Sequence, residues 1–342
     1  MLYNTIIISR TDNIGDVALT LPLAGILKEK FPQVKIIFIG KGYTQPLIEA
    51  SVNIDKFENW DEIKKNNLKE QARIFKSWEA DAIIHVYPNQ EIARVAKEAK
   101  IPVRIGTSHR FYHWFTCNKR LHFSRKNSDL HEVLLNIKLL EPFGIKDTYK
   151  LENIPFYYGL NKVLPLEKSF ENLLDKTRIN IILHPKSKGS AREWGLENFL
   201  KLTKLLPEKK FKLFITGTSE DKLQMDFFFK GVPNPITDLT GKLSLSQLIS
   251  FIHAADGMVA CSTGPLHIAA ALGITTLGIY APMRPVFPKR WAPIGKKAHY
   301  MVMEKKCDAC KKQNVCKCIT DITPQDVAEK INQLLVKTVN QL

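Results

Sequence analysis

The sequence predicts an α/β protein with two domains, each a doubly wound parallel sheet. Short apolar runs alternate with stretches of helical periodicity along most of the chain, which is typical of parallel strands covered by helices on both faces. The alternation weakens over residues 145–178, an irregular stretch with two prolines, and then resumes. A chain of 342 residues also exceeds the size of one ordinary core, so two domains are expected.

Eight apolar runs are predicted strands, and the helices are expected between them. The predicted strands are 4–9, 34–40, 81–86, 103–106, 178–184, 211–217, 256–262 and 275–280. The predicted helices are 16–31, 61–78, 90–100, 195–206, 219–229, 244–254 and 264–272, and 323–335 follows a Thr-Pro start typical of a capped helix. We therefore expect an N-terminal domain over 1–160, a C-terminal domain over 161–322, and a final helical segment over 323–342 that could pack back toward the first domain.

The charge of the chain indicates a partner that carries phosphate. The formal net charge is +16, and residues 99–126 hold seven Lys and Arg but no Asp or Glu. Such an excess fits nucleic acid, a membrane surface or a phosphorylated substrate, although a merely basic solvated surface is the alternative. No apolar run approaches the ~20 residues that span a bilayer, and the start MLYNTIIIS is predicted to be a strand rather than a signal peptide. We expect a cytoplasmic protein with reduced cysteines.

The loop after the first predicted strand, in SRTDNIGDVALTLPL (9–23), carries a candidate base. Asp16 falls in the first turn of a helix, where the helix dipole favours a carboxylate. The spacing leaves two roles open for Asp16, a helix cap or a catalytic base. The segment lacks the GxGxxG fingerprint, so a dehydrogenase-type dinucleotide site is not supported.

The loop in ILHPKSKGSAREWGLENF (182–199) is a candidate diphosphate cradle. Cationic and hydroxyl side chains crowd it between a strand and a helix, namely Lys186, Ser187, Lys188, Ser190 and Arg192. Such groups bind phosphate oxygens, although a solvated basic loop is the bland alternative. Trp194 is expected to pack rather than to stack on a ligand.

The stretch ACSTGPLHIAAALG (260–273) predicts an anion site at a helix start. After Ser262, Thr263 and Gly264 make a turn with little bulk, Pro265 suits the first helical position, and the unpaired N–H groups there can bind phosphate. His267 in the first turn could point to the ligand or pack in the core.

A carboxylate that could bind ribose hydroxyls follows another strand, in FITGTSEDK (214–222). Glu220 is the candidate and Asp221 its rival by one residue, while an ordinary acid at a helix start is the alternative for either.

The order of these motifs resembles glycosyltransferase family 9, the ADP-heptose heptosyltransferases of lipopolysaccharide core assembly. The resemblance covers residues 5–335 and is more specific in the C-terminal half, where DLTGKLSLSQLISFIHAADGMVACSTGPLHIAAALGITTLGIYAP carries it. It implies a GT-B fold of two facing Rossmann-like domains, with the acceptor on the first and the nucleotide sugar, here ADP-heptose, on the second. It also implies an inverting, metal-independent transfer with no cofactor.

The resemblance also implies roles for individual residues. Asp16 matches the family's general base, and Arg192 the basic residue that contacts the departing diphosphate. The donor would be bound by Lys186, Ser187, Lys188, Glu220, Ser262, Thr263, Gly264 and His267. The family often has Asp where this chain has Ser262, which leaves the donor sugar open. Arg10 and Asn13 are expected to contact the acceptor.

The basic segment TSHRFYHWF (107–115) and its continuation suggest where an anionic acceptor binds. We expect Arg110, Lys119 and Arg120 to contact a glycolipid acceptor at the inner face of the cytoplasmic membrane, because cations interleaved with aromatic residues suit an anionic lipid surface. Stacking on single-stranded nucleic acid is the competing use of such a segment, although no nucleic acid is expected here. The aromatic residues Phe111, Trp114 and Phe115 could instead belong partly to the core.

The sequence CDACKKQNVCKC places Cys307, Cys310, Cys316 and Cys318 within twelve residues. This cluster could bind zinc or iron, but its spacing is short for a zinc ribbon, and no metal is expected. Two other functions stay open on the sequence: a sugar-nucleotide epimerase on the same fold, and a non-catalytic binder of phosphorylated glycolipid or nucleic acid.

Overall fold

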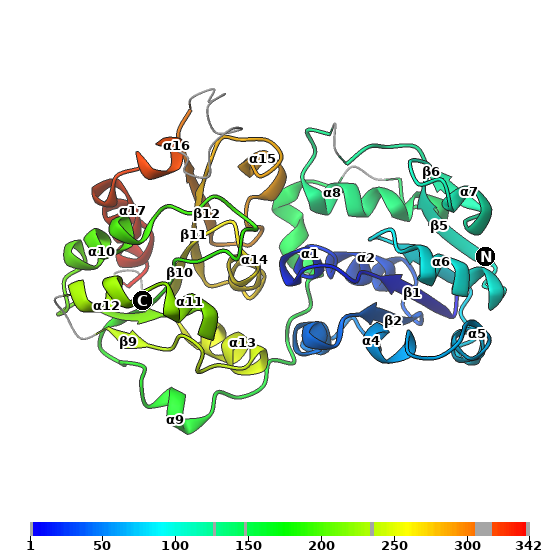
Figure 1. Ribbon diagram of the computed structural model, residues 1–342, viewed down its shortest axis with the longest axis horizontal. Helices are drawn as coiled ribbons and strands as arrows, with labels where there is room; N and C mark the ends of the chain where they lie inside the picture. The colour runs from blue at the N-terminus through cyan, green and yellow to red at the C-terminus, as the bar shows by residue number, and fades with distance from the viewer. Residues whose placement is uncertain (1–2, 126–127, 147–148, 233–235, 305–316, 340–342) are drawn as a thin grey trace. The chain divides into compact units, whose positions relative to one another are not determined.

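The computed structural model describes residues 3–125, 128–146, 149–232, 236–304 and 317–339. The chain divides into two compact units, Met1–Lys162 and Val163–Leu342 (Figure 1). Each unit is built on a six-stranded sheet in which all strand pairs are parallel. The predicted fold class, two doubly wound parallel sheets, is thereby confirmed.

The first unit has the sheet order β3-β2-β1-β4-β5-β6. Its strands are β1 (Thr5–Ser9), β2 (Lys35–Gly40), β3 (Lys56–Asn59), β4 (Ala82–His85), β5 (Val103–Thr107) and β6 (Lys119–Leu121). Its helices are α1 (Ile14–Ala18), α2 (Pro22–Lys30), α3 (Gln45–Glu49), α4 (Trp60–Ile63), α5 (Leu68–Ser77), α6 (Gln90–Glu98), α7 (His113–Thr116) and α8 (Glu132–Ile137), with 3₁₀ turns η1 (Gly42–Thr44), η2 (Lys138–Phe143) and η3 (Leu151–Tyr157).

The second unit has the sheet order β12-β11-β10-β7-β8-β9. Its strands are β7 (Ile179–His184), β8 (Phe211–Ile215), β9 (Thr237–Asp238), β10 (Gly257–Cys261), β11 (Thr275–Tyr280) and β12 (Ala298–Val302). Its helices are α9 (Lys168–Glu171), α10 (Leu196–Leu205), α11 (Ser219–Leu223), α12 (Asp226–Gly231), α13 (Leu245–Ala254), α14 (Gly264–Ala271), α15 (Pro288–Trp291), α16 (Lys317–Thr320) and α17 (Pro324–Val339).

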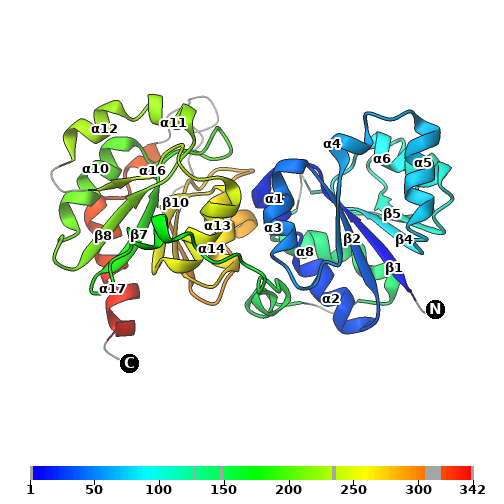
Figure 2. The same ribbon diagram turned by 90° about the horizontal axis from the view of Figure 1, so that it is seen from below.

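Helices cover both faces of each sheet, so the central strands are buried on both sides. In the first unit, α5 and α6 lie on one face of the sheet and α2 and α8 on the other (Figure 2). The strand β1 is accordingly buried along its whole length, with three isoleucines between Thr5 and Ser9. Burial on both faces explains why the central strands appear in the sequence as unbroken apolar runs.

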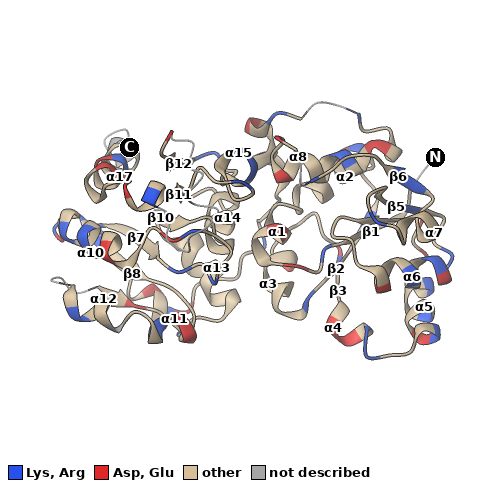
Figure 3. Ribbon diagram, turned by 45° about the horizontal axis from the view of Figure 1, so that its top comes forward, with Lys and Arg blue, Asp and Glu red and all other residues tan. Residues whose placement is uncertain are grey.

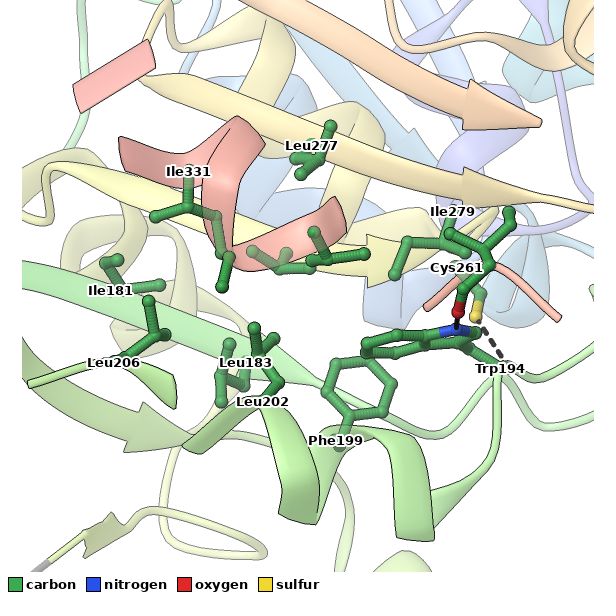
Figure 4. Packing of buried hydrophobic residues seen from close by; sticks show 14 of the residues in the cluster. Ile181, Leu183, Trp194, Phe199, Leu202, Leu206, Cys261, Leu277, Ile279 and Ile331 are labelled. Atoms are coloured by element: carbon green, nitrogen blue, oxygen red, sulfur yellow. Dashed lines mark hydrogen bonds between the residues drawn. The ribbon is translucent and has the colours of Figure 1, made fainter. Parts of the chain in front are cut away.

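The core of the second unit is built around an indole ring. Trp194 is fully buried, packs edge-on against Phe199 with ring centroids 5.0 Å apart, and donates from Nε1 to the carbonyl of Ile322 at 2.8 Å (Figure 4). The same cluster contains side chains of α17, including Val327 and Ile331. Trp194 is thus a packing residue, as predicted.

The last helix belongs to the core of the second unit. The apolar side of α17 lies on α10, and Lys210 Nζ donates to Asn332 Oδ1 at 2.8 Å. The apolar stripe of α17 is thus used within its own unit, and the expectation that segment 323–342 also packs toward the first domain stays a prediction.

The four strands that the sequence did not predict are β3, β6, β9 and β12, and each one lies at the edge of its sheet. An edge strand is half solvated, so its sequence shows no continuous apolar run. The predicted helix over 16–31 is instead two helices, α1 and α2, because Pro22 supplies no N–H for a continuous helix and starts the second one. None of the described helices combines the length and the apolarity needed to cross a membrane.

Candidate active site

The two sheets have the same strand order. In each unit, the order in which successive strands are added to the sheet reverses between the first and the fourth strand. In the first unit the reversal lies between β1 and β4, and in the second between β7 and β10. Ligands of doubly wound sheets bind outside the carboxyl ends of the strands at this switch point. The loops after β1, β7 and β10 are the polar loops predicted to bind ligands.

At the first switch point, Asp16 is held by an ion pair and does not cap its helix. Helix α1 begins at Ile14 with Asn13 in the capping position, and the side chain of Asn13 makes no capping hydrogen bond. The Oδ1 atom of Asp16 accepts from Arg10 Nη2 at 2.5 Å. Burial raises the pKa of Asp16 to about 6, although the Arg10 charge acts in the opposite direction. A carboxylate with such a pKa can accept a proton near neutral pH.

Arg10 is nearly inaccessible, with only 3% of its surface exposed. Its Nε donates to Asp12 at 2.7 Å, and its Nη1 lies 3.4 Å from Glu132 Oε1. Burial opposes the charge of Arg10, but the carboxylates of Asp12, Asp16 and Glu132 outweigh burial and raise its pKa. Arg10, which we expected to contact the acceptor, is buried in this structure and contacts Asp12, Asp16 and Glu132. Asn13 is exposed beside it.

Three residues of this site were not expected from the sequence to belong there. Glu132 and Asn136 on α8 both accept hydrogen bonds from Arg125, which also donates to the carbonyl of Val86 after β4. Asn136 is buried, and its Nδ2 donates to the carbonyl of Leu19 at 3.0 Å. In the sequence, Glu132 resembles any acid at a helix start, and its partner Arg10 lies 122 positions away. Only the sheet topology brings these residues together.

At the second switch point, the loop after β7 is organised by Glu193, which the sequence analysis did not single out. Its carboxylate pairs with Lys186 Nζ at 2.7 Å and accepts from the backbone N of Ser187 at 2.9 Å. The Ser187 hydroxyl lies 3.2 Å from the same carboxylate and 3.0 Å from the carbonyl of Ala191. Lys186 and Ser187 therefore shape the loop, and Arg192 lies partly buried next to Glu193.

The tip of this loop borders a pocket of about 430 Å³ lined by Lys186, Lys188, Gly189, Glu193, Glu220, Asp221 and Gln224. Lys188 and Gly189 have φ angles of +48° and +79°, so the backbone turns sharply there. Lys188 Nζ lies 3.5 Å from Glu220 Oε2, and both side chains are largely exposed. The pocket thus presents both a cation and a carboxylate to a ligand.

The structure separates the two acidic neighbours that the sequence could not distinguish. Asp221 is 4% exposed and completes a capping box, in which its Oδ2 accepts from the N and Oγ1 of Thr218. Glu220 is exposed at the pocket, and hydrogen bonding from Thr218 and the charge of Lys188 lower its pKa. Of the two, Glu220 is the acid available to a ligand.

The turn between β10 and α14 lies beside the loop after β7. Ser190 Oγ is 3.4 Å from the carbonyl of Ser262, and the backbone N of Trp194 donates to Cys261 Sγ at 3.2 Å (Figure 4). Thr263 is the capping residue of α14 but its side chain makes no capping bond. Within the described chain, the buried Thr263 Oγ1 has no hydrogen-bond partner. Gly264 starts the helix, and His267 is buried at 4% exposure.

The basic segment of the first unit exposes its aromatic residues. Phe111, Trp114 and Phe115 are 79%, 55% and 62% exposed, so they are not core residues. The guanidinium of Arg120 stacks 4.7 Å above the Trp114 ring. Arg110, Lys119 and Arg120 are also exposed, and part of β6 is blue in Figure 3. We call Arg110, Phe111, Trp114, Phe115, Lys119 and Arg120 the aromatic–basic patch.

Most of the cysteine cluster lies outside the described residues, namely Cys307, Cys310 and Cys316. Cys318 is buried in the core of the second unit. Among the described residues, no group of three or more His, Cys, Asp or Glu side chains is arranged to hold a metal ion.

The family model for glycosyltransferase family 9 (heptosyltransferase) matches residues 70–320. The chain belongs to this family. The glycosyltransferase is 24% identical over 296 residues to lipopolysaccharide heptosyltransferase 3 of Escherichia coli K12, covering 81% of this chain and 82% of that protein.

Two solved structures share the fold of this glycosyltransferase. A family 9 glycosyl transferase from Veillonella parvula is 20% identical with a TM-score of 0.77, and 98% of each chain is covered. ADP-heptose lipopolysaccharide heptosyltransferase II of Escherichia coli is 19% identical with a TM-score of 0.75, covering 98% of this chain and 99% of that one. The predicted GT-B class is confirmed by this likeness.

Proposed function

We propose that this glycosyltransferase transfers a heptose from ADP-heptose to the core of lipopolysaccharide or to a related anionic glycolipid. The observation that carries the proposal is the complementary chemistry of the two switch points. One holds a carboxylate whose pKa is raised, and the other holds cationic loops beside a helix start. A base for a hydroxyl and a cradle for a diphosphate are the two devices that glycosyl transfer needs.

The reaction is an inverting displacement at the anomeric carbon. The acceptor oxygen forms a bond to that carbon, the bond to the diphosphate oxygen breaks, and its electron pair leaves with the nucleoside diphosphate. Asp16 takes the proton of the attacking hydroxyl, which is typically worth about 10²- to 10⁴-fold in rate. One displacement from the face opposite the leaving group inverts the configuration.

The leaving diphosphate is stabilised by protein groups, without a metal ion. Lys188 and Arg192 supply positive charge, and the first N–H groups of α14 at Gly264 add the positive end of a helix dipole. The Thr263 hydroxyl, which is buried without a partner among the described residues, is a further donor to a phosphate oxygen. Lys186, already paired with Glu193, positions the loop.

The donor assignment draws on the relatives as well as on the pocket. The similar Escherichia coli structure is described as an ADP-heptose heptosyltransferase. The pocket beside Lys188 offers Glu220 to the ribose hydroxyls, with its carboxylate kept ionised by its lowered pKa. Ser262 stands where the family often has an aspartate for the donor sugar, so the sugar itself is the part of the proposal that most needs testing.

The acceptor is expected on the first unit, at a membrane surface. The aromatic–basic patch presents three exposed rings among cations. Aromatic rings suit the interfacial region of a bilayer, and each Lys or Arg adds about 1 kcal/mol at an anionic surface. We propose peripheral attachment to the cytoplasmic face of the inner membrane, which places the enzyme beside a glycolipid acceptor.

The proposed function is tested by a transfer assay with purified protein. ADP-heptose and heptose-deficient lipopolysaccharide core are incubated with and without EDTA, and the glycolipid product is identified by mass spectrometry. We expect one added heptose of inverted anomeric configuration in both reactions. Calorimetry with ADP-, UDP- and GDP-sugars tests the preference for the nucleobase and the preference for the sugar separately. A preference for UDP-sugars, or strict dependence on added Mg²⁺, would contradict the proposal.

The membrane part is tested by charge reversal of Arg110, Lys119 and Arg120 to Glu. We expect binding to vesicles with anionic lipid to fall by at least about 10²-fold, because about 1 kcal/mol is lost per cation. Donor affinity should not change. The matched control reverses three exposed lysines of the same unit, Lys30, Lys69 and Lys76, and should bind vesicles normally. Equal losses in both variants would show a non-specific charge effect, and binding to single-stranded DNA instead of vesicles would favour the nucleic-acid alternative.

A further inference from the structure

We propose that Glu132 and Arg125 are positioning residues that prepare Asp16 to accept a proton. The proposal rests on the role of Asp16 in the proposed function and extends it to residues on and just before α8. The geometry that carries it is a network of charged side chains at the switch point between β1 and β4.

The network contains two guanidinium groups and three carboxylates. Arg10 contacts Asp12, Asp16 and Glu132 through different nitrogens, at 2.7, 2.5 and 3.4 Å. Arg125 pairs with Glu132 and donates to Asn136 Oδ1 at 2.8 Å. Among the described side chains, these five groups together carry one negative charge in excess when all are ionised, and a single added proton makes their sum neutral. A partly buried cluster favours that neutral state, since burial penalises net charge.

The proton has a defined destination within the network. The side chain of Glu132 is 2% exposed and is held by both arginines, whereas that of Asp16 is 16% exposed and faces a single guanidinium. Asp12 is similarly exposed, at 15%, but its Oδ1 accepts from the Nε of Arg10 at 2.7 Å rather than from the Nη atoms that serve Asp16 and Glu132. Asp16 is therefore the carboxylate that a hydroxyl proton can reach and neutralise.

Glu132 acts on Asp16 in two ways. Its carboxylate faces Nη1 of Arg10 while Asp16 faces Nη2, so the negative charge of Glu132 competes with Asp16 for that cation. It also anchors Arg125, whose second nitrogen donates to the carbonyl of Val86 after β4, so the network is tied to both strands of the switch point. Removing Glu132 would leave Arg10 to pair more closely with Asp16, which would then be a weaker base.

Tyr43 and His131 are further titratable groups beside the network. Tyr43 Oη donates to the carbonyl of Asp12 at 3.2 Å, and burial raises its pKa, so it stays neutral. His131 precedes Glu132, and its Nδ1 accepts from the backbone N of Val133 at 3.2 Å. The remaining partner, Asn136, is an uncharged amide that donates to the carbonyl of Leu19.

The test measures the ionisation of Asp16 in two opposite variants. Glu132→Gln removes a negative charge and should lower the ionisation midpoint of Asp16 by about one pH unit, and Arg125→Gln removes a positive charge and should raise it by about as much. The midpoint is read from the ¹³C carboxyl shift in protein labelled at aspartate, with Asp16→Asn identifying the signal. The acid limb of the pH–kcat profile should shift in the same two directions.

The controls separate positioning from simple damage. Arg125→Lys keeps the charge and should titrate like the wild type, and Glu141→Gln removes an exposed carboxylate nearby and should change nothing. Midpoints that stay fixed, or that move in the same direction in both Gln variants, would overturn the proposal. If the Glu132→Gln variant fails to fold, the midpoint of Asp16 in Arg125→Gln compared with that in Arg125→Lys still tests the proposal. The NMR midpoint does not require any sugar transfer, so a wrong donor or acceptor would not obscure the result.

Discussion

The two switch points share one strand order but prepare opposite electrostatic environments. Between β1 and β4, Arg10 is buried and Arg125 is partly buried, and both pair with carboxylates, so the described side chains of this network carry a negative excess. In the second unit, a pocket lies between the loop after β7 and the residues after β8, and Lys188 in its lining is largely exposed. One topology therefore underlies both proposed roles, proton acceptance in one unit and anion binding in the other. The fold supplies the position, and the loop residues decide the chemistry.

The two sites differ in how far their cations are exposed to a ligand. Arg10 cannot reach a ligand because it is 3% exposed, and its charge forms ion pairs with Asp16 and the neighbouring carboxylates. In the second unit Lys186 is also paired, with Glu193, yet that pair shapes a loop whose tip remains open. Each loop therefore contains a cation that pairs with a carboxylate, Arg10 after β1 and Lys186 after β7. The loop after β7 also presents an exposed cation, Lys188, to a ligand. The following predictions test this contrast, beginning with the largest expected effect.

The first prediction concerns the base. Asp16→Asn should lower kcat by at least about 10²-fold, because the attacking hydroxyl loses its proton acceptor. Binding of the nucleotide sugar, measured by calorimetry, should remain close to that of the wild type. The exposed control Asp321→Asn should keep full activity. A nearly normal kcat in Asp16→Asn would mean that the network at the first switch point is only structural.

The second prediction concerns the diphosphate. Arg192→Ala should weaken binding of the nucleoside diphosphate by about 1.5–3 kcal/mol, the usual range for a hydrogen bond to a charged group. The affinity is measured by titration calorimetry on the free enzyme. Lys201→Ala removes an exposed cation from the adjacent helix α10 and should leave the affinity unchanged. Equal affinities for both variants would remove Arg192 from the site.

The third prediction follows from the pKa of Asp16, which burial raises to about 6. A base must be ionised to act, so activity should be half-maximal near pH 6, approach its full value above about pH 7 and fall about tenfold per pH unit well below pH 6. Affinity for the intact nucleotide sugar, whose diphosphate does not titrate over this range, should change little. The pH–kcat profile checks this sign, and a flat profile between pH 5 and 8 would contradict it.

The smallest effect is expected at Thr263. Thr263→Val removes a buried hydroxyl that has no partner within the described chain, so the unliganded protein should be as stable as the wild type or slightly more stable. Diphosphate affinity should fall by about 0.5–1.5 kcal/mol, since the hydroxyl would otherwise donate to a phosphate oxygen. In contrast, Thr203→Val breaks a bond to the carbonyl of Leu200 and should cost stability but not affinity. Thermal unfolding and calorimetry distinguish the two.

The amino-acid sequence by itself determined the fold class and the loops that matter. The eight central strands are buried on both faces, so their apolar runs were visible without any knowledge of their neighbours. The glycine, proline and hydroxyl residues of 262–265 likewise predicted the start of α14, because these residues limit the local backbone. Such features depend on interactions within a few residues.

Only the tertiary structure decided how the charged residues are used. The sequence could not distinguish cap from base at Asp16, nor Glu220 from Asp221, because burial and partners set those roles. Glu132 reaches Arg10 across 122 positions of the chain, and Glu193 gathers a loop that appears in the sequence as simply basic. The edge strands stayed hidden for the same reason, since pairing with a neighbour defines them more than their own residues do. Local sequence patterns therefore indicate which loops carry the charged residues. The long-range contacts, which no local pattern encodes, determine which partner each of those residues has.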